Sequence, residues 1–162
     1  MPIIARVHGP AVGVGCNYAL ACDLVVASEQ ALFGQVFVKI GLMPDGGSTY
    51  FLPRLVGYHK SFELMALGST IDAATARQLN LVNQVVPFAD LDPTVDSLAA
   101  RLLAAPRMAI EKIKAGLNHG LQSDLAAALN FEAVNQDACF HSRDFIEGVT
   151  AFVEKRKAVF GK

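Results

Sequence analysis

Gly13, Val14 and Gly15 form a turn whose composition suits the binding of negative charge. Glycines let a backbone approach a ligand closely, and the N-terminus of a following helix points free N–H groups at an anion. Such groups can stabilise an oxyanion that develops during a reaction. The alternative is that the glycines only let a helix pack closely on a strand. Together with Gly9 they do not fit the G-x-G-x-x-G pattern of dinucleotide-binding turns.

Other familiar reactive groupings are absent from the sequence. The four histidines lack an H-x-x-x-H pattern and acidic neighbours, so we predict no metal site. There is no Gly-x-Ser-x-Gly sequence of the kind that carries the nucleophile of serine hydrolases. The cysteines are sparse and form no CxxC pair, which predicts reduced thiols in a cytoplasmic protein; they are Cys16, Cys22 and Cys139.

The glycine turn lies between two predicted strands. Residues 3–7 and 24–27 are short β-prone runs, and the second is apolar enough to be covered on both faces. The segment 13–22 between them lacks strand alternation and predicts a buried helix. A strand, a helix and a strand at this spacing predict a crossover unit of an α/β sheet.

Helices dominate the predictions for the rest of the chain. Residues 31–37 are expected to be extended, 41–47 to form a long turn, and 48–56 to form a helix that stops at Gly57. The remaining predicted elements are a helix that ends at Gly68, a helix over 73–79 capped by Asp72, a short strand over 81–86, and helices over about 90–104, 107–119, 123–138 and 142–158.

The length and charge of the chain limit its class. Its 162 residues suit one ordinary domain. Charged residues make up 18%, below the roughly 25% typical of soluble domains, which predicts apolar surface buried against another subunit. The net charge of −1 offers no basic excess for nucleic acid, no apolar run reaches the ~18 residues of a membrane span, and the start lacks the layout of a signal peptide. We therefore expect a cytoplasmic protein that binds neither nucleic acid nor membrane.

Three stretches within residues 1–57 carry a family resemblance. In order, they are IIARVHGPAVGVGC at 3–16, Ala21-Cys22-Asp23, and Phe33-Gly34-Gln35 leading through Pro44-Asp45-Gly46-Gly47 to Leu52-Pro53-Arg54-Leu55-Val56-Gly57. This ordered set resembles the enoyl-CoA hydratase/isomerase (crotonase) superfamily, and most of all its isomerases of phenylacetate degradation. The similarity continues into the tail over 148–157 and covers essentially the whole chain.

The resemblance implies a crotonase-like α/β fold, a spiral of ββα units of the ClpP/crotonase type. Residues 1–67 would form the C-terminal part of the α/β core. Residues 68–162 would form a helical region that mediates assembly into a homotrimer or hexamer. Members of the family carry a longer N-terminal part, which holds one of two oxyanion-hole N–H donors. We therefore expect a natural short form, a truncation or a cleavage product.

The family's reaction passes through the enolate of an acyl-CoA thioester. The resemblance makes the Val14 N–H an oxyanion donor and places Gly13 and Gly15 against the substrate. Coenzyme A is part of that substrate, so we expect no separate cofactor. Hydratases of the family use two glutamates, at the positions of Asn17 and Phe37 here. Neither can exchange a proton, so hydration by two carboxylates is not available from them. Asn17 could hydrogen-bond substrate or water, or be structural, and Phe37 could line the acyl pocket or fill the core.

Asp45 is the remaining candidate for proton transfer. Isomerases of the superfamily often carry their acid on this turn, and one carboxylate suffices to take a proton from one carbon and return it at another. We expect Phe33, Phe37 and Met43 to wall in Asp45, since shielding from water helps a carboxylate to act as a base near neutral pH. The alternative is a turn aspartate that hydrogen-bonds its own backbone, as is common in Pro-Asp-Gly turns.

The resemblance also assigns a role to the tail. Phe152 and Lys155 would contact the adenine and 3′-phosphate end of coenzyme A, for which an aromatic face and a cation are suited. A solvated helix end is the alternative. The sequence as a whole predicts an enoyl-CoA isomerase of fatty acid or phenylacetate metabolism. A non-catalytic or truncated acyl-CoA-binding fragment is the second reading, and an enoyl-CoA hydratase, a lyase, is the third.

Overall fold

The computed structural model describes residues 1–161, which divide into two compact units. The first, called the strand unit, is Ile3–Ser97, and the second, called the helical unit, joins Met1–Pro2 to the chain from Leu98 onward. Sequence placed a division between residues 67 and 68. Strands that follow residue 68 pair with strands that precede it, so the segment up to residue 86 is part of the strand unit, which continues to Ser97.

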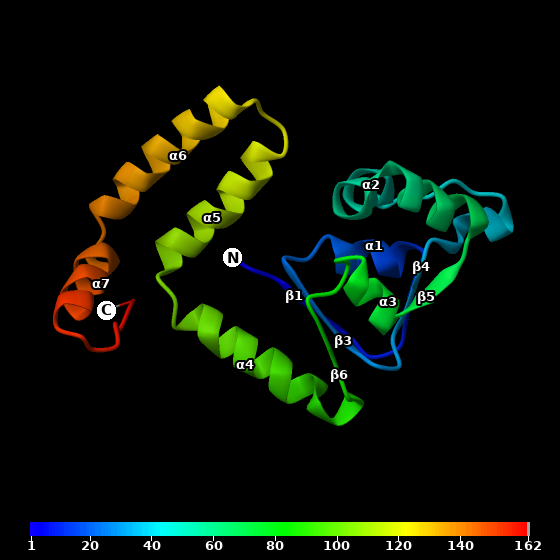
Figure 1. The fold of residues 1–162 in the computed structure, drawn as a ribbon, viewed down its shortest axis with the longest axis horizontal. Coiled ribbons are helices and arrows are strands. Elements are labelled where there is room, and N and C mark those ends of the chain that lie inside the picture. The colour runs from blue at the N-terminus through cyan, green and yellow to red at the C-terminus, as the bar shows by residue number, and fades with distance from the viewer. Residues whose placement is uncertain (162) are drawn as a thin grey trace. The chain divides into compact units, whose positions relative to one another are not determined.

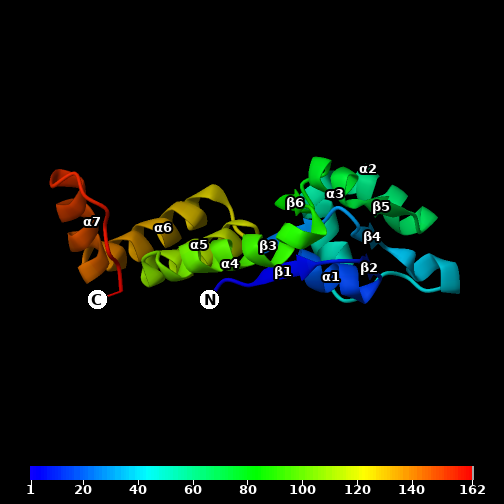
Figure 2. The ribbon, with the colours of Figure 1, turned by 90° about the horizontal axis from the view of Figure 1, so that it is seen from below.

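A parallel sheet forms the first layer of the strand unit. Its order is β1 (Ile4–Val7), β3 (Leu24–Ser28) and β6 (Gln84–Val86), and all pairs are parallel. Helix α1 (Val14–Leu20) lies in the chain between β1 and β3, and Figure 2 shows it beside β1. The predicted strand, helix and strand are therefore confirmed.

A second sheet was not predicted in full. It has the order β2 (Pro10–Val12), β4 (Leu32–Gly34) and β5 (Thr70–Asp72), with β4 parallel to β2 and antiparallel to β5. Both ladders end at Gly34, and the chain then turns into the 3-10 helix η1 (Val36–Ile40) rather than staying extended to residue 37. No strand was predicted over Pro10–Val12.

Helix α2 (Ser48–Leu67) consists of two helical segments separated at Gly57. Gly57 has φ 77° and ψ 169°, which is not helical, and Gly68 ends the helix with φ 59°. Both glycines were predicted as stops. The helices that follow in the chain are α3 (Ala73–Gln78), η2 (Phe88–Asp90) and α4 (Leu91–Leu103). Asp72 caps α3, since the Thr75 N–H donates to its carboxylate at 2.7 Å.

The core of the strand unit lies between its sheets and α2. Phe33 and Leu52 are the largest fully buried side chains in its cluster of buried apolar residues, to which Val82 also belongs. Leu52 belongs to the first segment of α2, so that helix is fixed against β4 by apolar burial. The turn over 41–47 precedes this helix and is held close to the core as a result.

The helical unit contains α5 (Arg107–Gly120), α6 (Leu125–Phe140) and α7 (Arg143–Val153). α5 and α6 pack side by side, as Figure 1 shows. Asp124 caps α6 by accepting from the Ala127 N–H at 2.8 Å, and Ser142 caps α7 by accepting from the Phe145 N–H at 3.1 Å. Within residues 1–161, no helix is both long and apolar enough to cross a membrane.

The last helix ends earlier than predicted. α7 stops at Val153, and Lys155 takes the left-handed conformation with φ 54°. The Arg156 guanidinium donates to both carboxylate oxygens of Glu147 at 2.6 and 2.9 Å, and the Val159 N–H donates to the same carboxylate at 2.9 Å. These bonds turn the chain back along α7, so the prediction of helix up to residue 158 is wrong.

Replacing Leu52 by alanine should lower the free energy of unfolding by about 2–5 kcal/mol, because a fully buried side chain would leave a cavity. Leu67 is the matched control. It lies in the same helix and is exposed, so Leu67→Ala should change that free energy by less than about 0.5 kcal/mol. Urea denaturation followed by circular dichroism measures both. Equal losses in the two variants would contradict this account of the core.

Candidate active site

The predicted oxyanion turn lies at the start of α1. Gly13 precedes the helix with φ 56°, a left-handed conformation that favours glycine, and its N–H donates to the Gly34 carbonyl at 2.8 Å. Val14 is the first helical residue, so its N–H has no acceptor one turn earlier in the helix. Gly15 follows it and is exposed, with open space where a side chain would be. The turn therefore offers a backbone donor at an accessible surface.

The turn that carries Asp45 packs directly against this helix. Gly46 has φ 57°, and a Cβ atom at this position would lie 3.0 Å from Val14 Cγ2 and 3.6 Å from Asn17 Nδ2. A glycine suits both this conformation and this close approach. The structure thus brings Val14 and Asp45, which are far apart in the sequence, to neighbouring positions.

The backbone carbonyl of Asp45 accepts three hydrogen bonds. Asn17 Nδ2 donates to it at 2.8 Å, Ser48 Oγ at 3.1 Å and the Ser48 N–H at 3.2 Å. Asn17 and Ser48 are both fully buried. The backbone of Asp45 is therefore anchored from the interior of the protein.

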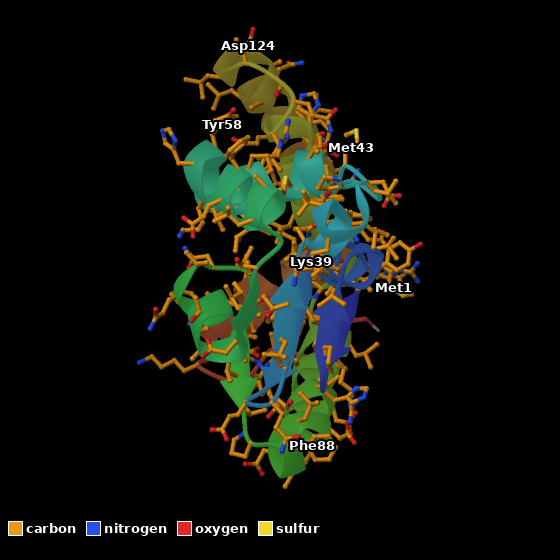
Figure 3. All side chains as sticks on the ribbon, turned by 90° about the vertical axis from the view of Figure 1, so that its right-hand side faces the viewer. Met1, Lys39, Met43, Tyr58, Phe88 and Asp124 are labelled. Carbon is orange, nitrogen blue, oxygen red and sulfur yellow. The ribbon has the colours of Figure 1, made fainter. Side chains whose placement is uncertain are left out.

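The carboxylate of Asp45, in contrast, is exposed. Among the residues that the structure describes, it has no hydrogen bond or ion pair. The alternative of a turn aspartate that hydrogen-bonds its own backbone is therefore not observed within those residues. The expected wall around it is also wrong. Phe33 points into the core with 1% of its surface exposed, whereas Met43 is 73% exposed and stands at the rim of the turn in Figure 3.

Asn17 is held by a second amide. Gln35 Nε2 donates to Asn17 Oδ1 at 2.6 Å, and both side chains are buried. Since the Asp45 carbonyl can only accept, Asn17 must direct its NH₂ group there and its oxygen toward Gln35. The sequence left open whether Asn17 binds substrate or water or has a structural role. Its contacts within the described residues are structural.

Phe37 lies beside the oxyanion turn. A Cβ atom at Gly13 would be 3.7 Å from Phe37 Cζ, and the ring is half-buried. An aromatic ring therefore lies next to the backbone donor.

The predicted coenzyme A contacts belong to the helical unit. Phe152 is 85% exposed, and Lys155 is exposed beyond the end of α7. They stay predictions. Among residues 1–161, no three histidine, cysteine, aspartate or glutamate side chains gather in a way that could hold a metal ion.

Gln35 and Ser48 are the residues of this site that sequence reasoning missed. Gln35 follows the last residue of β4, and Ser48 is the first residue of α2. The Gly-Gln pair at the end of a strand was part of the family resemblance, yet nothing local indicated which distant amide Gln35 would contact.

The family model for enoyl-CoA hydratase/isomerase matches residues 1–162. The chain belongs to the enoyl-CoA hydratase/isomerase family. It is 42% identical over 159 residues to a protein named crotonyl-CoA hydratase from Syntrophomonas wolfei. The aligned region covers 98% of this chain and 61% of that protein. It is 38% identical over 156 residues to a short-chain-enoyl-CoA hydratase from Clostridium acetobutylicum, with 96% and 60% covered.

Solved structures of this family share the fold. A crystal structure of enoyl-CoA hydratase subunit I from Geobacillus kaustophilus matches with a TM-score of 0.96 and 39% identity, over 99% of this chain and 62% of that one. An enoyl-CoA hydratase from Bacillus anthracis matches with a TM-score of 0.95 and 33% identity, over the same shares of the two chains. The predicted crotonase-type α/β fold is thereby confirmed. The chain spans about 61% of the length of the relative from Syntrophomonas wolfei.

The cysteine of the family's glycine turn should be unreactive. Burial raises the pKa of the Cys16 thiol to about 11, above its ordinary value of 9.0, and only a thiolate attacks an alkylating agent. At about pH 8, iodoacetamide should modify Cys22 and Cys139, which are only half-buried, before Cys16. Labelling of Cys16 should rise only as the pH approaches 11, where its thiolate forms.

Peptide mass spectrometry after timed labelling measures the three rates separately, and a Cys16→Ala variant confirms which peptide carries that thiol. Equal labelling of all three cysteines in the folded protein near neutral pH would contradict the burial of Cys16.

Proposed function

We propose that this member of the enoyl-CoA hydratase/isomerase family is an enoyl-CoA isomerase that uses Asp45 as its one proton-transferring group. The observation that carries the proposal is the arrangement of Asp45. Its backbone is fixed by three hydrogen bonds, its turn contacts Val14, and its carboxylate is exposed. A carboxylate on an anchored backbone, in a turn that contacts the residue carrying a free N–H, suits the removal of a proton next to a thioester carbonyl.

The proposed reaction moves a double bond without adding or losing atoms. The Asp45 carboxylate takes a proton from the carbon between the thioester and the double bond of a 3-enoyl-CoA. The electron pair spreads over the conjugated system as a dienolate, whose oxygen would accept a hydrogen bond from the Val14 N–H. The carboxylic acid then returns the proton two carbons further along the chain, which gives the 2-enoyl-CoA and restores the carboxylate.

The residues beside the turn favour isomerisation over hydration. Hydration needs one group to activate water and another to deliver a proton, and the family's positions for them hold Asn17 and Phe37. The amide of Asn17 is fully buried and bonded to protein groups, and Phe37 places an aromatic ring at the other position. The names of several relatives indicate hydratases, and that activity is the competing candidate.

A second candidate is an acyl-CoA-binding protein without turnover. It is favoured by the span of the chain, which covers about 61% of its relative from Syntrophomonas wolfei. In either case we propose acyl-CoA as the ligand, Phe152 and Lys155 as contacts of its nucleotide end, assembly as a homotrimer or hexamer, and a cytoplasmic location. Closeness to the isomerases of phenylacetate degradation belongs to the same proposal.

Asp45→Asn should lower kcat for isomerisation of a 3-enoyl-CoA by about 10²–10⁴-fold, because the amide cannot accept the proton. The conversion is followed by the ultraviolet absorbance of the 2-enoyl thioester, and incorporation of deuterium from D₂O reports proton transfer. Asp23→Asn is the matched control. Asp23 lies in the same unit, and its carboxylate accepts a hydrogen bond from the Ile3 N–H, away from the oxyanion turn. Full activity in Asp45→Asn would exclude Asp45 as the base.

The same assay tests the competing functions. Addition of water to a 2-enoyl-CoA by the wild-type chain would favour the hydratase. Saturable binding of acyl-CoA without conversion of either substrate would favour the binding protein.

Val14→Pro should lower kcat by about 10²–10³-fold, because proline removes the proposed oxyanion donor. Proline is tolerated at the first position of a helix, where the N–H has no intrahelical partner. Val14→Ala separates loss of the side chain from loss of the N–H and should retain most activity. Leu125→Pro is the matched control, since Leu125 is the first residue of α6 in the helical unit. Equal activity of Val14→Pro and Val14→Ala would exclude this N–H as the donor.

A further inference from the structure

A chain of two buried amides connects the end of β4 to the Asp45 turn. Gln35 donates to Asn17 at 2.6 Å, and Asn17 donates to the Asp45 carbonyl at 2.8 Å. Gln35 comes directly after Gly34, whose carbonyl accepts the Gly13 N–H at 2.8 Å. Two consecutive residues at the end of one strand thus hold both the oxyanion turn and, through Asn17, the Asp45 turn.

We infer that Asn17 is a positioning residue, which through this amide relay of Gln35, Asn17 and the Asp45 carbonyl fixes the proton-transferring carboxylate relative to the oxyanion donor. The inference rests on the proposed function for its catalytic consequence. Asn17 itself does not reach the substrate in this arrangement, since it is fully buried and its amide is bonded on both sides.

The side chain at position 17 has to donate a hydrogen bond to the Asp45 carbonyl. A carbonyl oxygen can only accept, so the group facing it must donate. An asparagine meets this need and can accept from Gln35 at the same time. An ionised glutamate, which family hydratases carry here, would place negative oxygens where the Asp45 carbonyl needs a donor.

The hydrogen bonds of the relay are buried, so breaking one of them costs free energy. An unpaired amide or carbonyl in the interior loses its hydrogen bonds to water without replacement. Ser48 supplies the two other donors to the same carbonyl from the first turn of α2. Removing Asn17 should therefore loosen the turn without abolishing it. A displacement of about 1 Å in a reacting group can lower a rate by about a hundredfold.

The test compares Asn17→Leu with Asn83→Leu in the full chain. Asn83 lies in the same unit and also binds backbone, since its Oδ1 accepts the Val25 N–H at 2.7 Å, but it does not contact the Asp45 turn. Asn17→Leu should lower kcat for 3-enoyl-CoA isomerisation by about a hundredfold with KM little changed, since the loss falls on placement of the base. Asn83→Leu should leave kcat near the wild-type value.

Amide hydrogen exchange provides a readout that does not depend on activity. The Ser48 N–H, which donates to the Asp45 carbonyl, should exchange about tenfold faster in Asn17→Leu and at the wild-type rate in Asn83→Leu. If Asn17→Leu does not fold, Gln35→Leu decides by the same two measurements, because it removes the donor that holds the Asn17 amide and should change both in the same direction.

The outcomes separate the two proposals. Wild-type kcat and exchange in Asn17→Leu, or an equal loss of kcat in Asn83→Leu, would overturn the positioning role. If the wild-type chain shows no isomerisation, the proposed function fails. The exchange of Ser48 then decides alone whether Asn17 holds the turn, and unchanged exchange would overturn the relay.

Discussion

The backbone carbonyl of Asp45 receives hydrogen bonds from two separate elements of the strand unit, α1 through Asn17 and α2 through Ser48. Gln35, after β4, supports the first of these through its bond to Asn17. This one acceptor therefore sets where the turn over 41–47 crosses the start of α1. Without it, an exposed turn that contains glycines at 46 and 47 would have few other reasons to adopt one conformation.

The same constraint fixes the backbone that carries an exposed carboxylate. Polar groups at the surface lose order unless the backbone that carries them is fixed, and here the fixing groups are fully buried while the carboxylate is not. Gly46 contributes by its lack of a side chain, which allows the turn to touch Val14 and Asn17. Preorganised placement of this kind reduces the reorganisation needed during a reaction.

Family membership and site chemistry give different information about this chain. The family model and the relatives establish a crotonase-type fold, and several relatives are named as hydratases. In our proposal, the side chains at positions 17, 37 and 45 decide which proton transfers can occur. Since one fold can support several reactions, the activity must be argued from these positions. Asn17 and Phe37 in place of acids leave Asp45 as the group on which our proposal depends.

Elements that depend on nearby residues were predictable from sequence. The strands over 4–7 and 24–28, the helix between them, the stops at Gly57 and Gly68, and the Asp72 cap all follow from local preferences, since each is decided within a few residues. Val14, Asp45 and Phe37 were likewise named from motifs, and the structure brings them to one region.

Tertiary structure decided what depends on distant partners. The three-residue strands β2 and β5 exist because β4 pairs with both, and such short segments carry almost no local signal. The chain turns back after α7 through the bond between Arg156 and Glu147, and Phe33 lies in the core instead of beside Asp45. The sequence by itself determined the family, the local elements and the chemical types at the site. Only the fold determined that Gln35, Asn17 and Ser48 would anchor Asp45, because a hydrogen bond between residues that far apart exists only once the core has placed their elements together.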